Sequence, residues 1–145
     1  MERRKAGITK NDGVIADAQA HSLLVVFSDP KMLLIDCDSQ GAFDTVCKNI
    51  QWGRGLLGAE KAWYTRSKGG NWHVYVQLVE PLPQLDRVLL QGALGGDPRR
   101  TLLDWSRTEQ GIGPEASVLF EYPDPPETTP IDLGNECSDT YGGPT

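Results

Sequence analysis

Short apolar or alternating segments occur at four places along the chain and predict four β-strands. The clearest is 72–78, in which every second side chain is apolar, so that one face of the strand is apolar and the other polar. The remaining three are 32–36, 62–66 and 117–121. The stretch 13–27 is ambiguous, because its first half could be helical whereas 22–27 is short and apolar, as in a buried strand.

Apolar residues at the helical spacing separate these strands. Four of them between positions 43 and 50 recur at i, i+3, i+4 and i+7 and predict an amphipathic helix. A second stripe over 85–93 ends at Gly95-Gly96. Asp97 and Pro98 then have the residue types of an N-cap and a first helical position, so another helix is expected to run to about residue 107.

The resulting order is β-α-β-β-α-β, with the second helical part broken in two. This is the order of the ferredoxin-like or RRM-like fold, an α+β class with an antiparallel sheet and helices on one face. In that topology the first and third strands are central, adjacent and antiparallel. We therefore expect one α+β domain over residues 14–122, between a flexible arm (1–13) and an acidic, Pro/Gly-rich disordered tail (123–145).

Composition narrows the class of protein. Hydrophobic residues make up 39% and charged residues 23%, an ordinary globular mixture. No apolar run approaches the ~20 residues that span a bilayer, and the N-terminal segment has no apolar core of the kind found in signal peptides. We therefore expect a soluble, cytoplasmic protein without a membrane partner. The three cysteines show no CxxC spacing, which supports neither a disulfide framework nor a zinc site.

The net charge of −6 is unevenly distributed. Six of the 20 acids lie in 121–145, which contains no Lys or Arg. Residues 1–120 therefore hold 14 acids and 14 basic residues and are neutral overall. A neutral body neither requires nor excludes a nucleic-acid partner.

The predicted topology brings three polar side chains to one end of the sheet. Asp36 and Asp38 end the first strand, and His73 begins the third. Antiparallel neighbours place these two ends side by side. Positions 36 and 38 also share the face that His73 takes when Val74 and Val76 are buried. Asp36, Asp38 and His73 are therefore the candidate catalytic residues.

Two carboxylates two residues apart suit a hard divalent cation such as Mg²⁺ or Mn²⁺, which keeps waters and substrate phosphates as further ligands. The turn before His73 could cradle an anion with its N–H groups, flanked by basic side chains. Metal plus cationic donors is typical of phosphoryl or nucleotidyl transfer. The candidate phosphate- or nucleotide-binding residues are Arg66, Ser67, Lys68, Asn71 and His73, with Arg99 and Arg100 from the polar loop before the last helix.

Each of these features also has a purely structural interpretation. A DxD sequence after an apolar strand commonly forms a turn with an N-cap role. Gly69-Gly70 is adequate for a hairpin turn, and the 95–100 loop caps a helix. Tyr75 either covers the sheet or stacks on a base. The coincidence of these features at one end of one sheet is what favours a functional site.

Three motifs between 33 and 121 resemble those of the archaeo-eukaryotic primase (primase-polymerase) superfamily. The segment 33–38 is similar to the first motif, an apolar strand ending in DxD. The segment 67–73 is similar to the second, a Ser/Gly-rich turn before a strand-borne His, and 118–121 to the third, an apolar strand carrying an acid. The resemblance implies an RRM-like core in which Asp36, Asp38 and Glu121 bind the metal and His73 contacts nucleotide phosphates. Catalytic members usually have an additional N-terminal α/β unit, so a small or reduced version is expected.

We therefore expect a primase-polymerase-like protein that binds a divalent metal and nucleotide or nucleic-acid phosphates. Nucleotidyl transfer in the replication of a phage or mobile element is the expected process, with replication proteins as partners. One alternative is a non-catalytic RRM-like module in which Tyr64 and Tyr75 stack on single-stranded nucleic acid. The other is a metal-dependent nuclease or phosphohydrolase that uses the same residues.

Overall fold

The computed structural model describes residues 24–67, 69–111, 117–121 and 127–134. These ranges contain, in chain order, β1 (Leu24–Phe27), β2 (Met32–Cys37), α2 (Gln40–Trp52), α3 (Arg54–Leu57), β3 (Ala59–Arg66), β4 (Trp72–Leu78), α4 (Gln84–Ala93), α5 (Pro98–Gln110), β5 (Val118–Glu121) and β6 (Thr129–Ile131). No helix within the described ranges is both long and apolar enough to cross a bilayer.

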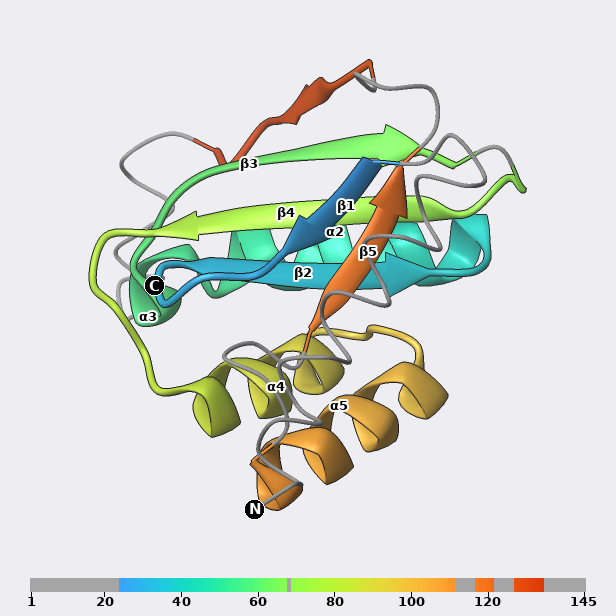
Figure 1. Cartoon of the computed structure of the whole chain (residues 1–145). Coiled ribbons are helices and arrows are strands. Elements are labelled where there is room, and N and C mark those ends of the chain that lie inside the picture. Colours follow the sequence, from blue (N-terminus) through green and yellow to red (C-terminus); the bar gives the residue numbers. More distant parts are fainter. Residues whose placement is uncertain (1–23, 68, 112–116, 122–126, 135–145) are drawn as a thin grey trace.

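The centre of the fold is a four-stranded antiparallel sheet with the order β2-β4-β3-β6 (Figure 1). β2 and β4 lie side by side and run in opposite directions, and their register pairs Asp36 with His73. The α+β class is therefore confirmed, as is the predicted adjacency of the first and third strands of the motif.

One face of this sheet packs against α2, which lies behind it in Figure 1. Ser39 starts α2, because its hydroxyl accepts the backbone N–H of Ala42. The side chains that face this core alternate along the strands, as the period of two requires. They are Leu33, Ile35 and Cys37 of β2 and Val74, Val76 and Leu78 of β4, packed with Val46 and Ile50 of α2.

The opposite face of the sheet is covered rather than open. β1 and β5 pair antiparallel as a separate two-stranded sheet, which crosses in front of β2 and β4 (Figure 1). A second small core of Leu34, Tyr75 and Leu119 is buried between the two layers. The prediction of helices on one face left this face uncovered, and that is wrong. The last strand of the predicted order pairs with β1 and does not join the four-stranded sheet.

The edge of β2 is occupied by the layer of α4 and α5, which explains why β5 does not pair there. The backbone N–H of Leu34 donates to the side chain of Gln91 at 3.1 Å. The carbonyl of Asp36 accepts the N–H of Asp97 at 3.0 Å. A strand at this edge would need these same backbone groups.

Part of the segment predicted as a disordered tail belongs to the fold. β6 pairs with β3, opposing Ile131 to Ala62. Ile131 and Leu133, two residues apart, are both buried. Pro130 fits because β6 is an edge strand. The prediction of disorder over 123–145 is therefore wrong for 127–134, while the rest of that tail and the 1–13 arm lie outside the described residues.

Candidate functional site

Asp36 and His73 meet at the end of β2 and the start of β4, as the register of the two strands requires. The imidazole Nε2 lies 3.6 Å from Asp36 Oδ1, an ion-pair distance that is too long for a hydrogen bond. His73 is only 6% exposed, and Oδ1 of Asp36 is buried without a hydrogen-bond partner among the described residues. An orphaned carboxylate oxygen in a buried position is costly, which marks this end of the sheet as a candidate site.

Glu121 reaches the same place from β5. Its side chain is fully buried and accepts hydrogen bonds from Thr65 Oγ1 at 2.8 and 2.9 Å, from the Tyr75 hydroxyl and from His73 Nδ1 at 3.1 Å. Burial by itself would raise the pKa of this carboxyl. The donors of His73, Tyr75 and Thr65 outweigh burial and hold the pKa of Glu121 below its ordinary value.

Positive charge comes to Asp36 from α5. Arg100 Nη2 lies 3.9 Å from Asp36 Oδ2. α5 begins here with Asp97 as its N-cap, and α2 begins directly beyond the end of β2. Two helix N-termini thus lie close to the end of β2, and their partial positive charge favours an anion.

Asp104 is a second buried carboxylate near this end, and sequence reasoning did not single it out. It is 1% exposed; Oδ2 accepts the hydroxyl of Ser117 at 3.0 Å, and Oδ1 has no partner among the described residues. Burial raises its pKa to about 6, although the Ser117 hydrogen bond and the charge of Arg100 oppose this shift.

Asp38 and the turn before His73 lie outside the set of contacts that joins Asp36, His73, Glu121 and Arg100. Asp38 is exposed, beyond the last residue of β2. The turn bonds to itself: the N–H of Asn71 donates to Ser67 Oγ at 3.0 Å, and the N–H of Gly70 donates to the Ser67 carbonyl. These N–H groups are therefore not offered to an anion, and Lys68 lies outside the described residues.

The predicted arginines differ in their positions. Arg66 places its guanidinium 3.8 Å from the ring centre of Trp72 and donates to the Gly70 carbonyl. Arg99 is exposed in the first turn of α5, with its backbone N–H bonded to Asp97. Arg100 is therefore the predicted arginine that the structure brings to Asp36.

The predicted base-stacking tyrosines are corrected. Tyr64 lies on the face of the sheet that packs against α2, in an edge-to-face contact with Phe43 at 4.8 Å. Tyr75 lies on the opposite face, but it is 5% exposed and stacks on Trp63. Neither ring is presented to a base, because Tyr64 packs toward α2 and the face that carries Tyr75 is covered by β1 and β5.

The carboxylates at this end of the sheet differ in how well they fit a metal ion. All of the contacts of the Glu121 carboxylate described above are to hydrogen-bond donors, and none of its surface is exposed, so it does not fit the role of a ligand. Asp36 fits better, because one of its oxygens is unpartnered. The described residues contain no group of three or more His, Cys, Asp or Glu side chains arranged around one ion. A site on Asp36 and Asp38 would depend on substrate phosphates to complete it, as Mg²⁺ sites commonly do.

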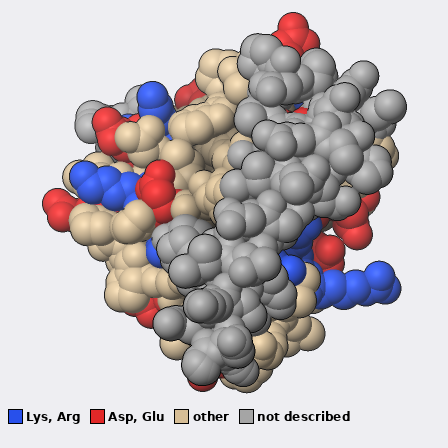
Figure 2. Space-filling view, in the orientation of Figure 1, with Lys and Arg blue, Asp and Glu red and all other residues tan. Residues whose placement is uncertain are grey.

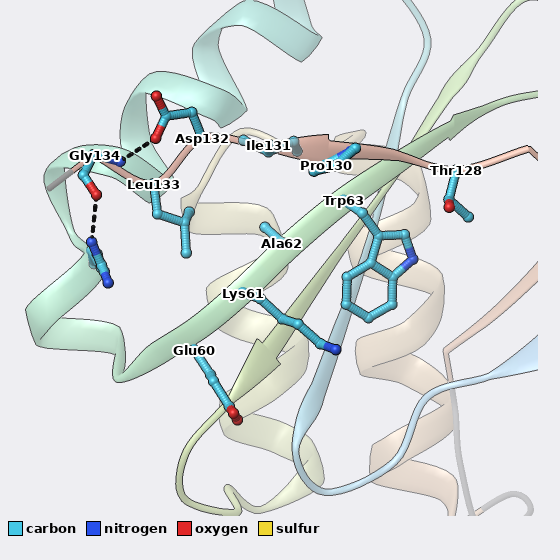
Figure 3. Close-up of a pocket in the computed structure, with 11 residues that line it drawn as sticks. Glu60, Lys61, Ala62, Trp63, Thr128, Pro130, Ile131, Asp132, Leu133 and Gly134 are labelled. Carbon is cyan, nitrogen blue, oxygen red and sulfur yellow. Dashed lines mark hydrogen bonds between the residues drawn. The ribbon is translucent and has the colours of Figure 1, made fainter.

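The rest of the described surface offers no comparable group. A hollow of about 490 Å³ is lined by residues of β3, of β6 and of the segments next to them, and is shown in Figure 3. Two of its polar side chains bond within the protein: Arg54 Nη1 donates to the Gly134 carbonyl, and Asp132 Oδ1 accepts the Gly134 N–H. On the face seen in Figure 2, basic and acidic side chains are interspersed over the described surface.

Thr65 and Asp104 are the main residues that sequence reasoning missed. Thr65 opposes His73 across β3 and β4, so the register of that hairpin contained the signal. Asp104 had a weaker signal, as an acid within the apolar stretch of α5.

Comparison with family models, curated proteins and solved structures found no match.

Proposed function

We propose that the chain is a primase-polymerase-like protein that binds nucleotide or nucleic-acid phosphates, together with Mg²⁺ or Mn²⁺, where β2 ends and β4 begins. The observation that supports this most is the Asp36–His73 pair, which the register places on one face with Nε2 and Oδ1 3.6 Å apart. The proposed setting is the cytoplasm, in the replication of a phage or mobile element with replication proteins as partners.

The chemistry assigned to each residue follows from its position. The ion would be held by Asp36 and Asp38 and would supply charge stabilisation to a transferring phosphoryl group. Arg100, beside Asp36, and the N-terminus of α5 would bind phosphate oxygens. His73 would donate to a phosphate oxygen through Nε2 when both of its ring nitrogens carry a proton. These are positioning and electrostatic contributions, which account for most of the catalysis of phosphoryl transfer.

The alternative of a single-strand-binding module has less support. It depends on an open sheet face with exposed aromatic rings, whereas Tyr75 is buried and Tyr64 packs against α2. The nuclease or phosphohydrolase alternative uses the same residues as the leading proposal. It is separated from nucleotidyl transfer by the products of the reaction.

The test incubates the protein with labelled nucleotides, a primed template and Mn²⁺, and resolves extended from shortened strands. We expect extension by the wild type and losses of about 100-fold or more in Asp36→Asn and His73→Gln, a size typical for removal of one charge-stabilising group. Asp86→Asn is the matched control, since Asp86 is an exposed carboxylate at the start of α4, which follows the opposite end of β4.

Three results would contradict the proposal of nucleotidyl transfer. Strand shortening that requires Asp36 would assign a nuclease. Absence of any metal-dependent turnover, with single-strand affinity unchanged in Asp36→Asn and independent of Mn²⁺, would assign a binding module. Extension that survives Asp36→Asn unchanged would place the active site elsewhere.

A further inference from the structure

The acid of the third motif reaches the candidate site, but its contacts are those of a hydrogen-bond acceptor. Oε2 of Glu121 lies 3.1 Å from Nδ1 of His73 and also accepts from the hydroxyls of Tyr75 and Thr65. Oε1 accepts from Thr65 as well. With the side chain fully buried, this carboxylate is directed at the imidazole and not at the surface.

We propose that Glu121 is a positioning residue, which keeps a proton on Nδ1 of His73 and turns Nε2 toward Asp36, and is not a metal ligand. The inference rests on the proposed function, because it makes Nε2 the atom of His73 that meets a phosphate oxygen. The group held in position is therefore a hydrogen-bonding imidazole beside a carboxylate.

The direction of the hydrogen bond follows from the chemistry of the two groups. An ionised carboxylate can only accept, so Nδ1 of His73 must donate to Oε2. This holds for the neutral ring and for the imidazolium alike. A carboxylate on one ring nitrogen fixes the tautomer and the rotation of the ring, and thereby the direction of the other nitrogen.

The surroundings of the ring support the same orientation. His73 lies between Asp36 on β2 and Thr65 on β3, its two register partners. With Nδ1 directed at Glu121, Nε2 falls 3.6 Å from Asp36 Oδ1, the oxygen without a hydrogen-bond partner. A ring rotated by half a turn would put Cδ2 in the place of Nδ1 and Cε1 in the place of Nε2, and would lose the 3.1 Å contact to Glu121.

The test is nitrogen NMR of the histidine side chains at neutral pH in the full chain. The protein has two histidines, so His21→Gln assigns the His73 signals. We expect Nδ1 of His73 to be protonated in the wild type. In Glu121→Gln the protonated fraction of Nδ1 should fall by about half or more, because an amide can offer either an oxygen or an NH₂ group to the ring. Tyr75→Phe is the matched control, since it removes one donor to Glu121 without changing the acceptor that faces His73, and it should leave Nδ1 protonated.

The inference is overturned if Nδ1 is unprotonated in the wild type, or if Glu121→Gln leaves its protonation as in the wild type. The first measurement does not use Glu121→Gln, so it decides even if that variant does not fold. Addition of ATP with Mg²⁺ tests the proposed function separately, through the Nε2 resonance of His73. A fixed Nδ1 proton with an Nε2 signal that ATP does not move would support the positioning role and contradict the nucleotide site.

Discussion

Glu121 on β5 and Asp104 on α5 are both almost fully buried, with exposed fractions of 0% and 1%. Glu121 accepts hydrogen bonds from Thr65, His73 and Tyr75, and its pKa is held below the ordinary value. Asp104 accepts a hydrogen bond from Ser117 and has an oxygen without a partner, and burial raises its pKa to about 6.

These two carboxylates are alike in exposed fraction and differ in the number of hydrogen-bond donors around each. Burial disfavours the charged form of any carboxyl group, and hydrogen bonds to the carboxylate favour it. Donors from three side chains are enough to reverse the effect of burial at Glu121. At Asp104 the hydrogen bond from Ser117 and the charge of Arg100 together are not enough to reverse the effect of burial on the pKa. The number of donors therefore indicates which buried acid is held ionised as part of a defined arrangement.

The largest expected effect is on stability at pH 7. Glu121→Gln should lower the free energy of unfolding by about 4 kcal/mol, because it removes the charged partner of buried donors. The matched change Asp104→Asn should cause no loss or a small gain, because it removes a charge that burial disfavours. Urea unfolding of both variants measures this. Equal losses of stability in the two variants would show that the number of donors does not determine how much each carboxylate stabilises the fold.

The pH dependence of stability should differ in sign between the two carboxylates. Asp104 has a raised pKa in the fold, so its contribution is full below about pH 4 and is lost as the pH rises through about 6. Two pKa units correspond to at most about 3 kcal/mol. Glu121 has a lowered pKa, so its contribution is present at neutral pH and is lost as the pH falls.

Urea unfolding of the wild type and of Asp104→Asn between pH 4 and pH 7 measures the pH-dependent contribution of Asp104 to the free energy of unfolding. The advantage of the wild type over the variant should shrink as the pH rises. A constant difference over this range would show that Asp104 titrates alike in the folded and unfolded chains.

A smaller effect is expected from removal of one donor. Thr65→Val takes the hydroxyl away from Glu121 and leaves His73 and Tyr75 in place. The free energy of unfolding should fall by about 1 kcal/mol, the typical net value of one hydrogen bond. Ser117→Ala removes the hydrogen bond of Asp104 in the same way. The pKa of Asp104 should then rise further, and NMR titration of the Asp104 carboxyl carbon checks this.

The smallest effect concerns the arginine near Asp104. Arg100 lowers the pKa of that carboxyl, and it is partly exposed. Arg100→Gln should therefore move the Asp104 titration to higher pH, with a change in stability below about 1 kcal/mol. The carboxyl-carbon titration of Asp104 in the two proteins measures the shift. A shift to lower pH would contradict the assigned role of Arg100.

The register of the two central strands could be predicted from the sequence. The alternation over 72–78 and the apolar strand that ends at Asp36 were enough to predict that Asp36 and His73 face each other. The reason is local, because a period of two along each strand fixes which side chains share a face. The same logic supplied the α2 core of Val46 and Ile50, since helical spacing fixes one apolar stripe.

The positions of β5 and β6, and the partners of Glu121, were decided by the tertiary structure. The last strand of a βαββαβ order is expected beside β2. The side chain of Gln91 and the N–H of Asp97 occupy backbone groups of that edge instead. β5 instead pairs with β1 across the sheet and brings Glu121 to His73.

By itself, then, the sequence determined the α+β class and the face shared by Asp36 and His73. Only the folded chain decided that this face is covered, that Tyr75 is buried, and that Glu121 bonds to His73. Local periodicity reports the direction of a side chain relative to its own strand. Which segment covers that side chain depends on competition between distant parts of the chain for the same backbone hydrogen bonds and apolar surface.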